Sequence, residues 1–167
     1  MAGYPFSGKS YIVELITQKS TKDILVINPK EYRGNNYDNL SSLEKREVNL
    51  SAWETSLDAL RVIIRETNNN DITIFDTACA SADVMEGVFR DAKSAGHAVL
   101  LVYVNADIGV CEKRAGKERL SDDVMKKYET NIASSIKRLW KISDGKIIVD
   151  NNYNKEPDIT VVLRYIS

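Results

Sequence analysis

The stretch that decides the fold lies at the start of the chain and reads Gly3-Tyr4-Pro5-Phe6-Ser7-Gly8-Lys9-Ser10. It matches the pattern G-x-x-x-x-G-K-[ST], in which glycines let successive backbone N–H groups turn inward around a phosphate group. A helix that begins at about Lys9 would add the positive end of its dipole to the same anion. The Lys9 ammonium can then reach the β- and γ-phosphates of a nucleotide, and the Ser10 hydroxyl can ligate Mg²⁺.

The setting of this loop is unusual, because only Met1 and Ala2 precede it. Such a loop normally follows a buried strand, so we expect that the first strand of the fold is missing from this chain. A start site set several residues too late, or a fragment, is the simplest account. A chance glycine-rich turn is the alternative reading, but an apolar helical run follows directly at residues 11–16.

Composition is that of an ordinary globular domain, which we expect to span residues 1–167. The 23 Lys and Arg residues against 24 Asp and Glu give no basic excess, so overall charge does not favour nucleic acid, although a local basic cleft would still permit it. No apolar run is long enough to span a bilayer and no secretory signal opens the chain, which predicts a cytoplasmic protein without a membrane partner. Cys79 and Cys111 have no C-x-x-C partner and are expected to be buried free thiols.

Four short apolar runs are typical of buried strands, and helical patterns separate them. The strands are expected at residues 24–27, 72–76, 98–104 and 146–150. Helices are expected at residues 9–19, from Ser51 to about Ile64, at 83–95, from residue 106 and at 128–140. Ser51 and Glu54 have the form of a capping box. The tail at residues 159–166 is compatible with either a helix or an edge strand.

This alternation predicts a P-loop-type α/β fold with three layers, α/β/α, around a mostly parallel sheet. Ligands of such sheets bind beyond the carboxyl ends of the strands. Residues 3–10, 28–33 and 76–81 all follow a strand or the place where one belongs. We therefore expect these three segments to converge at one edge of the sheet.

Three of these places carry side chains with a suitable chemistry. Asp76 closes an apolar strand and could orient Mg²⁺ or position an acceptor, although it could also simply cap the next helix. Glu31 could accept the proton of an attacking hydroxyl, and Arg33 could hold an acceptor phosphate in a bidentate fork. The alternative reading of both residues is a solvated loop of mixed charge.

A charged segment at residues 113–127 follows the third strand and could fold over the site as a lid. It contains Lys113, Arg114, Lys117 and Arg119, with Gly116 among them. An arginine that closes over the β- and γ-phosphates can contribute much of the rate of phosphoryl transfer. The alternative is a solvated helix face, which is the usual role of such a charge run.

Four stretches, in this order, resemble the kinase domain of the phage polynucleotide kinase group and the related small P-loop kinases of zeta-toxin type. The loop is similar to that group's G-x-P-x-S-G-K-S form. Residues 27–33, with Asn28 and then Glu31-Tyr32-Arg33, resemble its acceptor-site stretch. Phe75-Asp76-Thr77 resembles its Asp-Thr after the second strand, and residues 113–128 resemble its lid and the helix that follows.

The resemblance implies an ATP- and Mg²⁺-dependent kinase that transfers the γ-phosphoryl group to a hydroxyl acceptor. The implied nucleotide-binding residues are Gly3, Tyr4, Pro5, Phe6, Ser7, Gly8, Lys9, Ser10 and Tyr11, with Ser10 and Asp76 at the metal. Lys9, Glu31, Arg33, Asp76 and either Arg114 or Arg119 would be the catalytic set. One departure stands out, because the family's catalytic aspartate falls at Lys30, with Glu31 adjacent.

Three functions follow from these features. The first is a kinase for a polynucleotide 5′-hydroxyl, or for a hydroxyl on a nucleoside in DNA, with DNA or RNA as the partner and, for a phage protein, the host cytoplasm as its location. The second is a kinase of zeta-toxin type that acts on a small metabolite or a nucleotide sugar, which the near-neutral charge favours slightly. The third is a module that binds ATP without transferring phosphate, which Lys30 at the position of the base favours. The sequence leaves the oligomeric state open.

Overall fold

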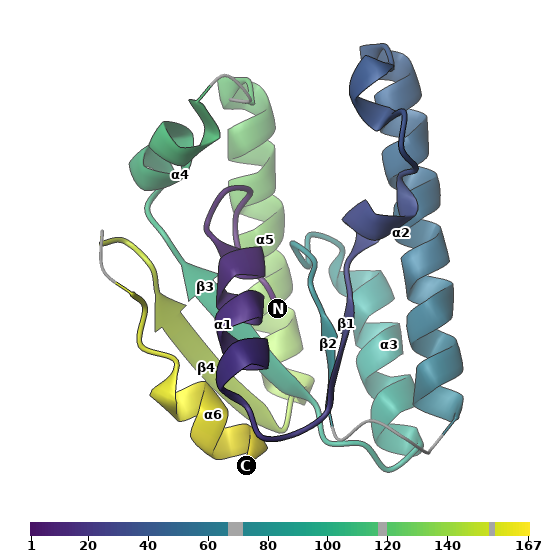
Figure 1. The fold of residues 1–167 in the computed structure, drawn as a ribbon, viewed down its shortest axis with the longest axis vertical. Helices are drawn as coiled ribbons and strands as arrows, with labels where there is room; N and C mark the ends of the chain where they lie inside the picture. Colours follow the sequence, from purple (N-terminus) through teal and green to yellow (C-terminus); the bar gives the residue numbers. More distant parts are fainter. Residues whose placement is uncertain (67–71, 117–119, 154–155) are drawn as a thin grey trace.

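Two pairs of parallel strands form the centre of the fold (Figure 1). A computed structural model of the protein describes residues 1–66, 72–116, 120–153 and 156–167. Strand β1 (Ile24–Ile27) pairs with β2 (Ile72–Phe75), and β3 (Leu100–Asn105) pairs with β4 (Gly145–Asp150). The four predicted strands and their parallel pairing are confirmed.

Helices cover both faces of these strands, which gives the predicted three layers. Helices α1 (Lys9–Lys19) and α6 (Thr160–Ile166) pack on one face, against Val102, Val104 and Val149. Helices α2 (Ser42–Arg65), α3 (Ala82–Ser94) and α5 (Asp122–Ile142) pack on the other face. The tail of the chain is therefore a helix rather than an edge strand.

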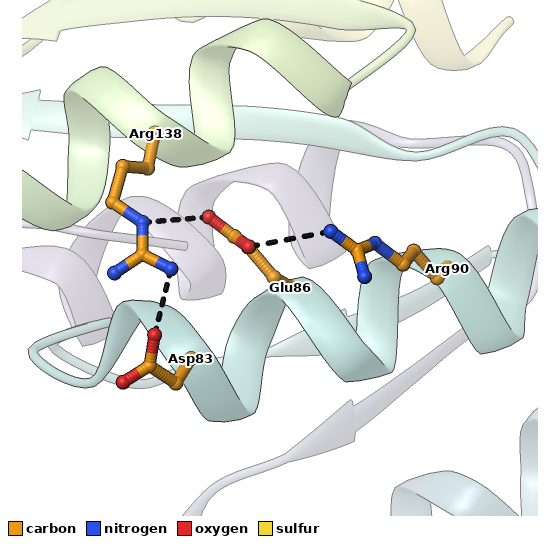
Figure 2. Close-up of polar contacts among 4 residues, drawn as sticks. All are labelled: Asp83, Glu86, Arg90 and Arg138. Carbon is orange, nitrogen blue, oxygen red and sulfur yellow. Dashed lines mark hydrogen bonds and ion pairs between the residues drawn. The ribbon is translucent and has the colours of Figure 1, made fainter.

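Shorter helices surround the carboxyl ends of the strands. The 3-10 turn η1 (Pro29–Tyr32) follows β1, η2 (Tyr37–Asn39) leads into α2, and α4 (Ile108–Ala115) follows β3. A surface cluster joins α3 to α5, where Arg138 donates hydrogen bonds to Asp83 and Glu86 (Figure 2). Every helix in the described part of the chain is too short or too polar to span a bilayer.

The start of α2 corrects the sequence prediction. The expected N-cap, Ser51, lies inside the helix, and Ser41 is the real N-cap. The Ser41 hydroxyl accepts a hydrogen bond from the Glu44 N–H, and the Glu44 carboxylate accepts one from the Ser41 N–H, which completes a capping box. Residues 43–47 are mostly strong helix formers, so nothing stops the helix between Ser42 and Ser51.

The first two residues of the chain lie between β2 and β3, where Met1 N donates to Phe75 O and Ala2 N to Val102 O. Ala2 is fully buried and forms a single parallel bridge with Tyr103 of β3. Its N–H donates to Val102 O at 2.8 Å, and its carbonyl accepts from Val104 N at 2.8 Å. One residue thus holds the phosphate loop to β3, while β1–β2 and β3–β4 remain two separate sheets.

Candidate active site

The loop at residues 3–10 adopts a backbone that only particular residues allow. Gly3 and Gly8 have positive φ angles, of 146° and 90°. A Cβ atom on Gly3 would lie 2.6 Å from Val104 O, and one on Gly8 would collide with the Asn151 side chain. Phe6 also has a positive φ, of 61°, which is uncommon outside glycine and is found at functional loops. Helix α1 begins directly after this loop, at Lys9.

The Lys9 ammonium points back into the loop. Its Nζ donates to Tyr4 O at 2.7 Å and to Gly3 O at 3.2 Å. Burial lowers the pKa of Lys9, and the Asp76 carboxylate opposes this effect in part. The Gly3 and Tyr4 carbonyl groups hold the Lys9 ammonium inside the loop. A bound phosphate group would attract this ammonium, which lies at the position that the motif requires of its lysine.

Asp76 connects the loop to the ends of β1 and β2. Its Oδ2 accepts hydrogen bonds from Ser10 Oγ at 2.6 Å and from Asn28 Nδ2 at 3.0 Å. The residue is only 5% exposed, and its buried Oδ1 has no hydrogen-bond partner within the described part of the chain. The predicted convergence of the three segments is therefore observed at this carboxylate.

The Ser10 hydroxyl and the Asp76 carboxylate suit a magnesium ion. Mg²⁺ prefers oxygen ligands and is usually held by one or two protein groups together with substrate phosphates and water. The free Oδ1 of Asp76 provides such an oxygen beside Ser10. The described residues contain no cluster of three or more acidic, histidine or cysteine side chains that could hold a metal without a nucleotide.

A clamp of Arg114 and Asn151 supports the loop from the side of β4. Asn151 is 5% exposed, and its Nδ2 donates to Ser7 O at 2.8 Å. Arg114, in α4, donates to Ser7 O at 3.3 Å and to Asn151 O at 2.8 Å. Arg114 was predicted as a lid arginine, and the structure places its guanidinium group on the backbone of the phosphate loop.

The residues predicted for the acceptor side lie in η1 and directly after it, and η1 packs against α2. The Asn28 side chain caps this turn by accepting from Lys30 N at 2.9 Å. Glu31 is exposed, and Arg33 places its guanidinium 4.8 Å from the centre of the Tyr37 ring. The Nε atom of Arg33 is buried without a hydrogen-bond partner among the described residues. The Arg33 guanidinium thus lies over the Tyr37 ring.

Other titratable groups near the loop are unsuited to acid–base or nucleophilic chemistry near neutral pH. Burial, together with the neighbouring Tyr4, raises the pKa of Tyr103 to about 12. Burial also raises the pKa of the Cys79 and Cys111 thiols. Both cysteines are free and buried, as predicted.

The predicted lid can be followed only in part. The predicted segment at residues 113–127 begins inside α4, which ends at Ala115, and finishes inside α5, which begins at Asp122. Arg119 lies outside the described residues, so its predicted role stays a prediction.

Sequence reasoning named Asn28 within the acceptor-site stretch without assigning it a role, and it missed Asn151 as a member of the site. Asn28 and Asn151 each come directly after an apolar strand, at the carboxyl edge where ligands of parallel sheets bind. That position was the available signal for both residues. The side-chain amides donate to Asp76 and to the phosphate loop, respectively.

Comparison with solved structures supports the fold. A proposed kinase from Chloroflexus aurantiacus, solved at 1.70 Å resolution, matches with a TM-score of 0.68 over 99% of this chain and 93% of that chain, at 13% sequence identity. The chain has the α/β fold of P-loop kinases. No curated protein matches the sequence.

The family comparison covers most of the chain. The model of the family described as "Zeta toxin" matches residues 1–139, which include the loop, η1, Asp76 and most of α5. The zeta-toxin part of the predicted resemblance is thereby confirmed, whereas the polynucleotide kinase part stays a prediction. Together with the fold, the match identifies the chain as a member of the zeta toxin family of P-loop phosphotransferases.

Proposed function

We propose that the protein transfers the γ-phosphoryl group of ATP to a hydroxyl group of a small metabolite or a nucleotide sugar. The observation that carries this proposal is the arrangement of Lys9, Ser10 and Asp76 at the mouth of the loop. Phosphoryl transfer depends mostly on positioning and on charge stabilisation, and these residues supply both.

Each residue of the site has a proposed role. The backbone N–H groups of the loop hold the β-phosphate, and the Lys9 ammonium leaves the Tyr4 carbonyl to contact the β- and γ-phosphates. Ser10 and Asp76 would hold Mg²⁺, which supplies positive charge to the phosphate oxygens. Arg114 and Asn151 keep the Ser7 carbonyl, and so the loop, in place.

We assign the acceptor to the side of η1. Arg33 is a suitable residue to hold an acceptor phosphate or carboxylate, because Tyr37 positions its guanidinium and a guanidinium presents several donors in a planar fork. Glu31 is the proposed base, since Lys30 stands where the family's aspartate is expected. Glu31→Gln should then reduce kcat by about 100-fold or more, with little change in nucleotide affinity. An unchanged kcat would remove Glu31 from the mechanism.

Family membership favours a small acceptor over a polynucleotide. The sequence prediction placed polynucleotide 5′-ends first and zeta-toxin-type acceptors second, and the family match is our reason for preferring the second. The net charge of −1 agrees with this preference, because it offers no general attraction for a phosphate backbone.

The direct test incubates the full chain with γ-labelled ATP, Mg²⁺ and a panel of acceptors. The panel contains nucleotide sugars, small polyols and amino sugars, together with 5′-hydroxyl DNA and RNA. We expect label in a small acceptor, and we expect Lys9→Met to abolish it. Lys137→Ala, which changes an exposed lysine on α5, is the matched control and should retain full activity. Label in DNA or RNA alone would reverse the acceptor assignment.

One observation favours a second function. Lys30 at the position of the expected base is consistent with a module that binds ATP but transfers nothing. Measurable ATP binding that Lys9→Met abolishes, without labelled product from any acceptor, would establish that module and exclude the kinase.

A further inference from the structure

The segment that carries Arg33 has no apolar anchor of its own. Arg33 lies between the turns η1 and η2, and neither turn contains a buried residue. A segment with few buried apolar contacts opens at a low cost in free energy unless neighbouring elements hold it. The order of the Arg33 side chain therefore depends on the contacts that these turns make with helix α2, against which η1 packs.

Two polar side chains of α2 hold η2. Lys45 and Asn49 are four positions apart, so they lie on the same face of the helix. The Lys45 Nζ donates to Asp38 O at 3.0 Å, and the Asn49 Nδ2 donates to the Tyr37 hydroxyl at 2.8 Å. Ala52, three positions beyond Asn49, is buried in the core. Helix α2 thus connects the core of the protein to the Tyr37 ring.

The Tyr37 ring connects this contact to Arg33. The guanidinium carbon of Arg33 lies 4.8 Å from the ring centre, and the Lys45 ammonium lies 5.6 Å from it. A cation over an aromatic ring is attracted by the negative charge of the ring face. The Nε atom of Arg33 is buried and has no hydrogen-bond partner in the described part of the chain. The ring therefore holds the guanidinium, and Asn49 holds the ring.

Stability alone does not explain an asparagine at position 49. The Oδ1 atom of Asn49 is buried and finds no hydrogen-bond partner among the residues that the structure describes. A buried acceptor without a partner destabilises the folded state relative to an apolar side chain of similar shape. The amide donor that Asn49 offers to Tyr37 is the feature that an apolar side chain could not replace.

We propose that Asn49 is a positioning residue for the acceptor. It orients Tyr37, and Tyr37 holds the Arg33 guanidinium in one orientation before the acceptor binds. The inference rests on the proposed function for the assignment of the acceptor to Arg33. An arginine that is ordered in advance loses less side-chain entropy on binding, which corresponds to about threefold to tenfold in affinity for one side chain.

The first measurement uses the full chain without nucleotide or acceptor. Hydrogen exchange of the Arg33 Nε–H is followed by ¹⁵N NMR, and its signal is assigned by its loss in Arg33→Lys. Asn49→Leu replaces the amide by an apolar side chain of similar size, whereas Tyr37→Phe keeps the ring and removes the hydroxyl. Asn39→Leu, at an exposed residue of η2, is the matched control.

We expect the Arg33 Nε–H to exchange about threefold to tenfold faster in Asn49→Leu and in Tyr37→Phe, because each variant releases the ring. The control should exchange at the rate of the parent protein. The thermal midpoint of Asn49→Leu should equal or exceed that of the parent, since the variant removes a buried acceptor without a partner.

The second measurement uses the acceptor that the labelling panel identifies. Asn49→Leu and Tyr37→Phe should each raise the KM for the acceptor by about threefold to tenfold, with kcat and the KM for ATP unchanged. The double variant should resemble either single variant, because both substitutions break the same contact.

The two measurements separate this inference from the proposed function. An unchanged exchange rate at Arg33 in Asn49→Leu, or an equal change in Asn39→Leu, would overturn the inference even if an acceptor is labelled. So would a lower midpoint together with a higher KM for both substrates, which would assign Asn49 to the folding of α2. Faster exchange in a protein that labels no acceptor would sustain the positioning of Arg33 by Asn49 and overturn the proposed function alone.

Discussion

At the scale of single residues, we expect Lys9 to favour nucleotide binding but not to stabilise the folded protein. Its ammonium is held by carbonyl groups in a site where burial lowers its pKa, so the charged form is disfavoured in the folded protein. We expect Lys9→Met to weaken nucleotide binding by about 100-fold, the scale of charge-assisted hydrogen bonds to phosphate. The same substitution should leave the free energy of unfolding unchanged or raise it. Calorimetric titration with nucleotide and urea unfolding measure the two quantities.

The pH dependence of this effect has a definite sign. Because the pKa of Lys9 in the folded state lies below its ordinary value of 10.5, the unfolded chain binds more protons between the two values. Stability of the parent protein relative to Lys9→Met should therefore rise as the pH increases through that window. A difference in unfolding free energy that falls between neutral pH and about pH 10.5 would contradict this account.

Gly8 and Asn151 form a contact that can be tested as a pair. Gly8→Ala places a methyl group against the Asn151 amide and also strains a backbone with a φ of 90°. We expect it to cost about 1–3 kcal/mol of stability and to weaken nucleotide binding. Asn151→Ala relieves the collision but not the strained φ, so Gly8→Ala should cost less in that background. Additive costs in urea unfolding of the double variant would show that the two residues do not interact.

These residues also show what the sequence could reveal about the site. Lys9 and Ser10 were predictable because a short motif encodes their geometry, and Asp76 because it ends an apolar strand. The partner of Ser7 was not predictable from any local pattern, since Asn151 lies 144 positions away in the chain. Only the pairing of β3 with β4 brings it to the loop.

At the scale of elements, strands were predicted more reliably than the start of α2. A buried parallel strand is a short apolar run with clear ends, so four residues such as Ile24–Ile27 suffice to identify it. Two capping-box patterns compete at the start of α2, at Ser41 and at Ser51. The local pattern cannot rank them, and the packing of η1 against α2 is a tertiary contact that a window of sequence does not contain.

At the scale of elements, the surface cluster that joins α3 to α5 should contribute to stability in a way that depends on salt concentration. Arg138 of α5 bonds to Asp83 and Glu86 of α3, and Arg90 also pairs with Glu86 (Figure 2). The hydrogen bond from Arg138 lowers the pKa of Glu86, so this contribution to stability is present above the ordinary pKa of a glutamate and is lost as the pH falls. Because Asp83, Arg90 and Arg138 are exposed and Glu86 is only partly buried, we expect a small effect.

Arg138→Met should therefore lower the thermal midpoint slightly at low salt and near neutral pH. The difference from the parent should shrink in 1 M salt, where the screening length is about 3 Å, and at acidic pH. Arg61→Met, which removes a pair within α2 alone, is the matched control, and it should change the midpoint less because its pair joins no second helix. A midpoint difference for Arg138→Met that is independent of salt would assign the effect to packing of the arginine stem instead.

At the scale of the whole molecule, the sequence predicted the three layers but not the division of the strands into two sheets. That division, and the cavity of about 940 Å³ that is lined by β2 and β3, depend on how helices from the entire chain close over both faces. The fold holds its phosphate loop to β3 through Ala2 and to β4 through Asn151. Residues that lie far apart in the sequence thus provide the support for the phosphate loop that a single strand could give.

The cavity that β2 and β3 line reverses the expected effect of enlarging a buried side chain. Ala92 of α3 is 8% exposed and lines this cavity, so Ala92→Leu adds apolar volume to open space and should stabilise the protein by about 1 kcal/mol. Ala52 of α2 is 2% exposed and lies outside that lining, so Ala52→Leu should destabilise it by about 1–3 kcal/mol through overpacking.

Urea unfolding of both variants measures the contrast. If Ala92→Leu destabilises the protein as much as Ala52→Leu does, the space between β2 and β3 is already closed in solution, because the added methyl groups then meet packed atoms.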